Sequence, residues 1–237
     1  STPCVAGSDG ASDLPLVREA FPRTIRLVAS ARLREAVLMP LVDDAAELDL
    51  LAEIEGATSG RLIAEERGLG GLSPDELVHG VPHARFINAS FAYAKPRAAM
   101  RFSPANRGAW YAALRLETCI AEVGHHLTLA LADVGNFNAV VEYGEMLASM
   151  SGVFVDLREL AEHPALDPDP ATGYAEGNAV ATRARAHGHN GVIYPSVRHT
   201  GGTCVAALWP NVVQSVVQGA MVRLTWTGNS EYVWEPI

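Results

Sequence analysis

Apolar residues recur at steps of three and four in the N-terminal third of the chain, which is the spacing of a helix face buried against a core. The pattern runs from Leu16 to about Gly68, past a glycine-containing break. It is carried by Leu27, Val28, Leu33, Val37, Leu38, Leu41, Leu48, Leu51, Ile54, Leu62 and Ile63. We therefore predict an N-terminal helical subdomain of two or three helices over residues 14–78, preceded by a flexible tail at residues 1–13.

The pattern changes after Pro82 to short runs of β-prone residues separated by Gly, Pro and Asn. Two helical stretches, at residues 117–131 and 174–187, interrupt these runs. Strands mixed with helices, without regular βαβ alternation, predict an α+β domain over residues 79–237. The runs are RFINASFAY, GAWYAAL, NAVVEY, VFVDL, GVIYPSV, CVAALWP and VRLTWTG.

Composition and charge narrow the classes of function. The chain has 18 Lys and Arg against 27 Asp and Glu, a formal net charge of −9, so it would repel a nucleic-acid backbone unless its arginines gather in one pocket. No apolar run approaches the ~20 residues that span a bilayer, and the first residues lack the pattern of a secretion signal. We expect no direct nucleic-acid binding, no membrane span and a cytoplasmic location.

Motifs for common cofactors are absent from the sequence. The glycines at 68, 70 and 71 lack the spacing of a dinucleotide-binding turn, and no phosphate-binding loop of the Walker type occurs. Neither His125–His126 nor His187–His189 has an acidic or thiol partner at a usual ligand spacing, so no metal site is predicted. Three cysteines without a CxxC pair are expected to be free thiols.

One segment, residues 100–126, gathers side chains suited to chemistry. It holds Arg101, the pair Trp110–Tyr111 and Glu122 in one strand–turn–helix stretch. A helix that begins near Thr118 places Glu122 and His126 on the same face, because positions four apart lie above one another. Apolar neighbours on both sides of Glu122 indicate that its carboxylate lines a sheltered pocket.

A second segment, GVIYPSVRHTGGTC at residues 191–204, reads as a strand that runs into a loop. The loop presents Ser196, Arg198 and His199. Loops at strand ends are common places for binding and catalytic residues. This loop is therefore a second candidate part of a site.

The two segments together resemble the RES domain, a family named for its characteristic Arg, Glu and Ser. The resemblance runs from about Val81 to Trp209 and rests on residues in the family's order. It carries over Arg101, Tyr111, Glu122 and Ser196 to the family's active-site positions. The matching residues are Arg101, Phe102, Tyr111, Thr118, Ala121, Glu122 and the sequence YPSVR.

The resemblance implies a fold similar to ADP-ribosyltransferase toxins, with NAD+ as the substrate and the toxin's role in a toxin–antitoxin pair. The partner would be an antitoxin that covers the active site and resembles a helix-turn-helix protein. The family also has an earlier arginine in its pocket, and Arg85 is the nearest candidate in this sequence. The helical region over residues 14–78 would be an extension to the minimal domain.

The same residue types suit NAD+ on chemical grounds. A guanidinium grips a pyrophosphate with paired hydrogen bonds, as Arg101 and Arg85 would, and an aromatic face such as that of Tyr111 attracts the cationic nicotinamide. Glu122 would stabilise the positive charge that develops on the ribose when the glycosidic bond breaks. Ser196 could bind a ribose hydroxyl, the nicotinamide amide or Glu122 itself.

Other functions remain open at this stage. Ser196 or Cys119 could be the nucleophile of an acyl hydrolase with His199 as its base. A non-catalytic binding module is a further alternative, because each residue named also has a purely structural explanation. For an NAD+-cleaving enzyme, the ADP-ribosyl acceptor is equally open between water, phosphate and a protein side chain.

Overall fold

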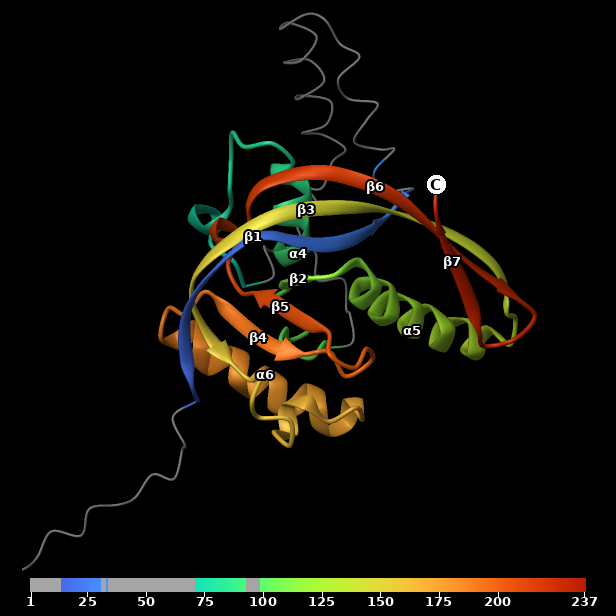
Figure 1. Cartoon of the computed structure of the whole chain (residues 1–237). Coiled ribbons are helices and arrows are strands. Elements are labelled where there is room, and N and C mark those ends of the chain that lie inside the picture. The colour runs from blue at the N-terminus through green and yellow to red at the C-terminus, as the bar shows by residue number, and fades with distance from the viewer. Residues whose placement is uncertain (1–13, 31–32, 34–70, 93–98) are drawn as a thin grey trace, which may run out of the picture.

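A computed structural model describes residues 14–30, 33, 71–92 and 99–237 of the chain (Figure 1). Among these residues it contains three α-helices: α4 (Ala84–Ala92), α5 (Leu116–Val134) and α6 (Pro170–Ala186). Three short 3-10 helices, η2 (Pro74–Glu76), η3 (Pro164–Leu166) and η4 (Pro210–Val212), lie between the larger elements. The fold class is α+β, as the sequence predicts.

Seven strands of the described residues form one mixed sheet in the order β1-β2-β5-β4-β3-β6-β7. Only β3 and β4 run parallel. Because β1 pairs with β3 as well as with β2, the first five strands in this order close into a ring. The strands are β1 (Leu16–Ala29), β2 (Trp110–Ala113), β3 (Asn138–Asp156), β4 (Gly191–Pro195), β5 (Thr203–Ala207), β6 (Gln214–Thr227) and β7 (Tyr232–Pro236).

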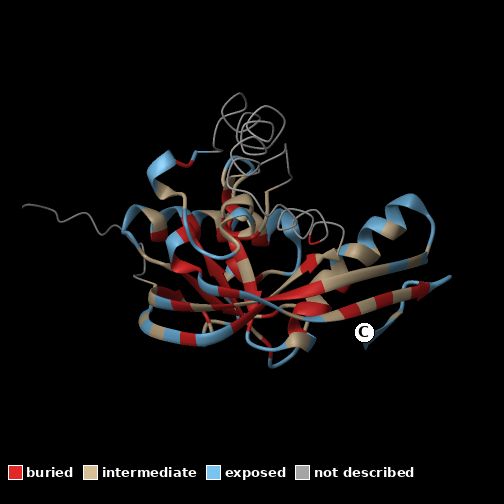
Figure 2. Ribbon diagram, turned by 90° about the horizontal axis from the view of Figure 1, so that it is seen from above, coloured by how far each residue is buried: buried red, intermediate tan, exposed pale blue. Residues whose placement is uncertain are grey.

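The core lies on both faces of this sheet, and Figure 2 shows its buried residues concentrated where the strands cross. One apolar cluster includes Trp110, Phe154 and Phe91 of α4. A second cluster, on the other face, joins Tyr194 and Cys204 to α6 and the start of α5. Strands β2, β4 and β5 are therefore covered on both faces, which explains why their sequences are nearly continuous apolar runs.

The two longer helices confirm the sequence prediction for residues 117–131 and 174–187, and their ends follow local chemistry. Helix α6 begins after Asp169, whose side chain accepts a hydrogen bond from the Ala171 amide. Helix α5 ends at Gly135, which adopts the left-handed conformation that favours glycine at this position. In Figure 1, α6 underlies β4 and β5, while α5 underlies the far end of β3 and β6.

The prediction of a helix from Leu16 onward is wrong for residues 16–29, which form strand β1. Its buried residues are Phe21, Thr24, Ile25 and Val28, at the spacing i, i+3, i+4 and i+7 of a helix face. The strand produces this spacing because its pairing with β3 is interrupted by a bulge between Phe21 and Thr24, and because both of its faces are buried. The bulged strand therefore has the spacing of buried residues that is typical of a helix.

The boundary predicted near residue 79 is also not a division of the structure, since β1 belongs to the same sheet as the strands that follow. Leu33 is buried in the cluster around Trp110. The predicted tail at residues 1–13 and the predicted helices over residues 34–70 lie outside the described residues. Residues 14–29 are thus part of the main domain.

The run RFINASFAY, predicted as a strand, is instead helix α4. Ile87 and Phe91, four positions apart, form its buried face against the core. Before α4, Ser73 precedes the single turn η2, and its backbone amide donates to the Glu76 carboxylate at 2.7 Å. The other β-prone runs confirm the prediction and lie within β2 to β6.

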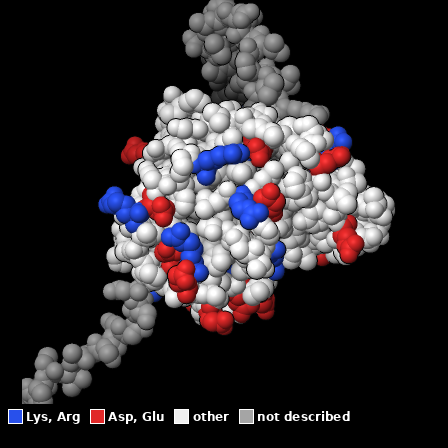
Figure 3. Space-filling model, viewed as in Figure 1, with Lys and Arg blue, Asp and Glu red and all other residues white. Residues whose placement is uncertain are grey.

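Charged side chains are dispersed over the described surface. On the face shown in Figure 3, most Arg side chains lie close to Asp or Glu rather than in one extended basic patch. Within the described residues, no helix has both the length and the apolar character to cross a bilayer. The same part of the chain holds no group of His, Cys, Asp and Glu arranged for a metal ion.

The placement of β1 predicts that its buried residues stabilise the main domain. Ile25→Ala should lower the free energy of unfolding by about 2–5 kcal/mol, because it leaves a cavity beside Ala113 and Cys119. Arg23→Ala, at an exposed position of the same strand, should change it by less than about 0.5 kcal/mol. Chemical denaturation of both variants checks this; equal stabilities would contradict a structural role for β1.

Candidate active site

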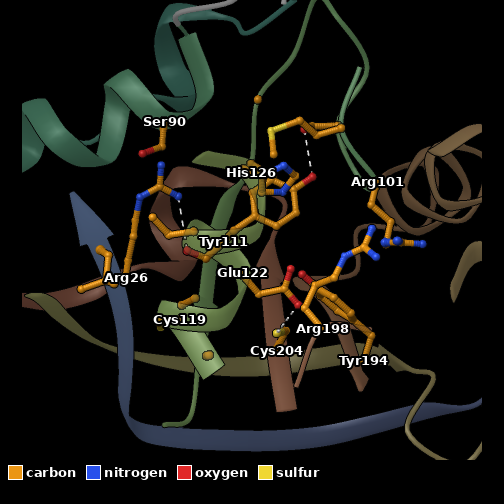
Figure 4. A pocket seen from close by; sticks show the side chains of 18 of the residues that line it. Arg26, Ser90, Arg101, Tyr111, Cys119, Glu122, His126, Tyr194, Arg198 and Cys204 are labelled. Atoms are coloured by element: carbon orange, nitrogen blue, oxygen red, sulfur yellow. Dashed lines mark hydrogen bonds between the residues drawn. The ribbon is translucent and has the colours of Figure 1, made fainter. Parts of the chain in front are cut away.

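A cavity of about 230 Å³ is lined by residues of α4, α5 and α6 as well as by residues of the sheet (Figure 4). Its walls come from segments far apart in the sequence: β1, the loop before β2, the start of α5, Tyr174 of α6 and the ends of β4 and β5. Arginine, tyrosine and a single glutamate supply its large polar groups. The cavity thus gathers the side chains for which the sequence analysis predicted a site.

Glu122 reaches the cavity from the second turn of α5, and Ser196 lies beside it at the end of β4. The Ser196 hydroxyl donates a hydrogen bond of 2.5 Å to the Glu122 carboxylate. Its oxygen in turn accepts bonds from the backbone amides of Arg198 and His199, at 3.2 and 3.0 Å. Ser196 is buried, so the loop after β4 holds the carboxylate in one orientation.

Arg101 is a buried cation whose guanidinium is anchored on one side. Its Nη1 donates to the backbone carbonyls of Ala165, at 2.5 Å, and Asp167, at 2.9 Å. The group also lies over the ring of Tyr174, 5.6 Å from its centre. These contacts use the two hydrogens of Nη1, and the side chain lines the cavity.

Tyr111 is a residue of β2 whose side chain lines the cavity. Its hydroxyl accepts from the Phe102 amide at 3.0 Å and shares a hydrogen bond of 2.9 Å with Ser103. Burial raises the pKa of Tyr111, so the hydroxyl stays protonated at neutral pH. Because these contacts fix the hydroxyl end, the side chain is held rigidly as part of the cavity wall.

A second arginine in the cavity wall is Arg26 of β1, and not Arg85. The Arg26 guanidinium lies 4.9 Å from the centre of the Trp110 ring and donates to the Tyr111 carbonyl at 3.3 Å. Arg85 is exposed on α4, whose inward face is taken by Ile87 and Phe91, and it does not line the cavity. The sequence pointed to Arg85 and not to Arg26 because the apolar residues of β1 have the spacing of a helix face and the composition of α4 is β-prone.

Two further polar side chains lie at the cavity. Arg198 donates from Nη2 to the Pro168 carbonyl at 3.0 Å, and His126 follows Glu122 by one turn of α5. Partial burial lowers the pKa of His126, although the Glu122 carboxylate acts in the opposite direction. His126 therefore adds a neutral polar group beside Glu122 at neutral pH.

The nucleophiles of the hydrolase alternative are poorly arranged for it. Burial raises the pKa of Cys119 to about 12, and its thiol donates to the Ile25 carbonyl. Ser196 faces a carboxylate, while the imidazole of His199 is hydrogen-bonded to Thr118 through Nδ1 at 2.9 Å. A hydrolase would need a histidine base on the serine, so this geometry does not favour acyl transfer.

Four of the five residues predicted for the site therefore converge: Arg101, Tyr111 and Glu122 line the cavity, and Ser196 supports Glu122 from behind. The shared helix face predicted for Glu122 and His126 also holds. Arg26 was missed, although it stands between Ile25 and Leu27 in a run rich in β-branched residues. A strand reading of that run would have drawn attention to it.

Comparison with known proteins gives a family match and a remote structural similarity. A family model described as the RES domain matches residues 77–227. A chain of the crystal structure of the M. tuberculosis MbcT-MbcA toxin-antitoxin complex is 18% identical, over 53% of this chain and 72% of that one, with a TM-score of 0.38. No curated protein sequence matches. The family match covers more than half of the 237 residues, and the chain belongs to the RES-domain family.

Proposed function

We propose that this protein cleaves NAD+ at the bond between nicotinamide and ribose and transfers the ADP-ribosyl group to an acceptor. The observation that carries the proposal is the Glu122 carboxylate, held by Ser196 in a largely apolar cavity whose wall also carries three guanidinium groups and three tyrosine rings. NAD+ is a substrate of matching chemistry, since it has an anionic pyrophosphate and a cationic ring. Membership of the RES-domain family supports the same substrate.

In the bound state, guanidinium groups would contact the pyrophosphate of NAD+ and an aromatic ring would contact its nicotinamide. Arg101 has N–H groups beyond those of Nη1 that suit a phosphate, and Arg26 offers a second guanidinium from the opposite wall. The ring of Tyr111 would face the cationic nicotinamide. Arg26 and Arg101 are both anchored by backbone carbonyls, so little side-chain entropy is lost when they bind the pyrophosphate.

Cleavage breaks the C–N bond between the ribose C1′ and the nicotinamide nitrogen. The bonding electrons leave with nicotinamide, which becomes neutral, and positive charge develops on the ribose. A carboxylate beside C1′ stabilises that charge, which is the role we assign to Glu122. The acceptor oxygen then bonds to C1′ and loses its proton. Ser196 would keep the carboxylate aimed at the ribose throughout.

The acceptor is the part of the reaction that the cavity constrains least. Water or phosphate would make the enzyme a glycohydrolase or phosphorylase that depletes NAD+, whereas a protein side chain would make it a mono-ADP-ribosyltransferase. All three share the cleavage step and release nicotinamide. Adding NAD+ labelled on the adenylate to a cell extract separates them, because only protein transfer moves the label onto a protein band.

The proposal includes a biological role. We infer that the protein is the toxin of a toxin–antitoxin pair and that a helix-turn-helix antitoxin covers the cavity. This role rests on the resemblance to the RES family. Cleavage of NAD+ would explain toxicity directly, because NAD+ is needed throughout metabolism, and covering the cavity mouth would prevent the substrate from entering.

The first prediction for this function concerns the carboxylate. Glu122→Gln should reduce the rate of nicotinamide release by roughly 10²-fold or more while leaving NAD+ affinity nearly unchanged, because the amide keeps the shape and loses the charge. Glu117→Gln, exposed on the same helix, is the matched control and should behave as wild type. Nicotinamide release at the wild-type rate by a folded Glu122→Gln protein would contradict the proposed role of the carboxylate.

The second prediction distinguishes the two candidate arginines. Arg26→Ala should weaken NAD+ binding roughly 10- to 100-fold, because a charge-assisted contact with the pyrophosphate is lost. Arg26→Lys should recover only part of this affinity, since the ammonium lacks the planar fork. Arg85→Ala should bind NAD+ as wild type does. Calorimetric titration measures the affinities. Weaker NAD+ binding by Arg85→Ala, with wild-type affinity in Arg26→Ala, would show that Arg85 and not Arg26 binds the substrate.

The third prediction concerns the cell. Expression of the wild-type chain in bacteria should arrest growth, and co-expression of the neighbouring antitoxin gene should relieve the arrest. The Glu122→Gln chain, expressed to the same level, should be tolerated if toxicity comes from catalysis. Colony counts with immunoblots for protein level provide the measurement. Harmless accumulation of folded wild-type protein would argue against the toxin role.

A further inference from the structure

Arg101 lies in a tight loop, residues 100–103, that is not part of a strand of the sheet. Met100 and Ser103 exchange backbone hydrogen bonds, at 2.9 Å from the Met100 amide and 3.3 Å from the Ser103 amide. The loop follows residues 93–98, which lie outside the described part of the chain, and precedes β2. Its position must come from contacts with other elements, and several of these contacts belong to one face of α6.

Two glycines let α6 approach this loop at backbone distance. A Cβ built on Gly177 would lie 2.0 Å from the Arg101 carbonyl oxygen, which no side chain tolerates. A Cβ on Gly173 would lie 2.5 Å from Arg101 Nη1 and 2.2 Å from the Asp167 carbonyl oxygen. Helix interiors disfavour glycine by roughly 1 kcal/mol relative to alanine. Close packing against Arg101 therefore explains why glycine occupies both positions.

Polar side chains on the same face of α6 donate hydrogen bonds to the backbone of the loop. Asn178 donates from Nδ2 to the carbonyls of Met100 and Tyr174, both at 2.7 Å. Arg185, two turns further on, donates from Nη2 to the Phe102 carbonyl at 3.3 Å. Positions 174, 177, 178, 181 and 185 follow helical spacing, so this face forms one continuous surface. Backbone oxygens of Met100, Arg101 and Phe102 all lie against it.

The Arg101 side chain also depends on α6 and the segment before it. Its guanidinium lies over Tyr174 and donates to the carbonyls of Ala165 and Asp167. The ring of the next residue, Phe102, packs at a tilt against the Tyr194 ring with ring centres 4.8 Å apart, and the Phe102 amide donates to the Tyr111 hydroxyl. The same loop therefore sets the position of Arg101 and, through Phe102 and Ser103, that of Tyr111.

We propose that α6 is the positioning element of the substrate site, with Asn178 and Arg185 holding the loop 100–103 so that Arg101 points into the cavity. This inference rests on the proposed function, in which Arg101 binds the NAD+ pyrophosphate. Neither positioning residue lines the cavity or touches the substrate. They act through the backbone of the loop and so control NAD+ affinity more than the cleavage step.

The test uses Asn178→Asp in the full chain, because aspartate keeps the shape and removes both donors. KM for NAD+ in nicotinamide release should rise by about tenfold, with kcat changed by less than about threefold, if the lost bonds mainly misplace a ground-state binding group. Thr182→Ala, an exposed uncharged position one turn later on α6, is the matched control and should keep the wild-type KM.

A double-variant cycle shows whether the effect passes through Arg101. In an Arg101→Ala background, Asn178→Asp should raise KM no further, because the group it positions is already absent. A KM that rises by the same factor in both backgrounds would overturn the proposal, as would a wild-type KM in Asn178→Asp alone. If Asn178→Asp does not fold, Arg185→Gln, with Arg183→Gln as its exposed control on the same helix, gives the same cycle.

A second readout is independent of activity. Hydrogen exchange of the Met100 and Ser103 amides should be faster in Asn178→Asp than in wild type and in Thr182→Ala, because the loop loses its anchor. Unchanged exchange at these amides would overturn the positioning role even if NAD+ is not the substrate. Absence of nicotinamide release from the wild-type protein, with faster exchange in the variant, would instead reject the proposed function and leave the anchoring of the loop supported.

Discussion

The pairing of β1 with both β2 and β3 is the constraint on which the candidate site depends. It closes five strands into a ring and holds β2 beside β1 at Ile25 and Ala113. Arg26 and Tyr111, neighbours of this pair in sequence, then lie in one wall. The thiol of Cys119 bonds to the Ile25 carbonyl and ties the start of α5 to the same point. The position of Glu122 therefore follows from the closure of the sheet.

Opposite this wall, the cavity is completed by α6, the loop of Arg101 and the loop after β4. Helix α6 meets the loop of Arg101 at two glycines, and the loop after β4 holds Ser196 against Glu122. The close approach of α6 to the loop of Arg101 leaves little freedom for adjustment, because no side chain lies between the glycines and this loop. The position of Arg101 relative to Glu122 is consequently set by helix and sheet packing.

The electrostatic character of the cavity follows from this packing. Three guanidinium groups, those of Arg26, Arg101 and Arg198, share it with the single carboxylate of Glu122. In a chain of net charge −9, such a local excess of positive charge must be assembled from distant segments, and here it comes from β1, the loop before β2 and the loop after β4. This charge favours the binding of an anionic substrate. The Glu122 carboxylate would stabilise positive charge that develops on the substrate during the reaction.

The sequence by itself determined the α+β class, the helices α5 and α6 and most of the β-prone runs, and it singled out Arg101, Tyr111, Glu122 and Ser196, which the structure brings together. These follow from local periodicity and from residue order within a family motif. Only the tertiary structure decided that residues 16–29 form a strand and residues 84–92 a helix, and that Arg26 rather than Arg85 lines the cavity. The reason is that a bulged strand buried on both faces has helical spacing, and its true partner, β3, lies more than 100 residues away.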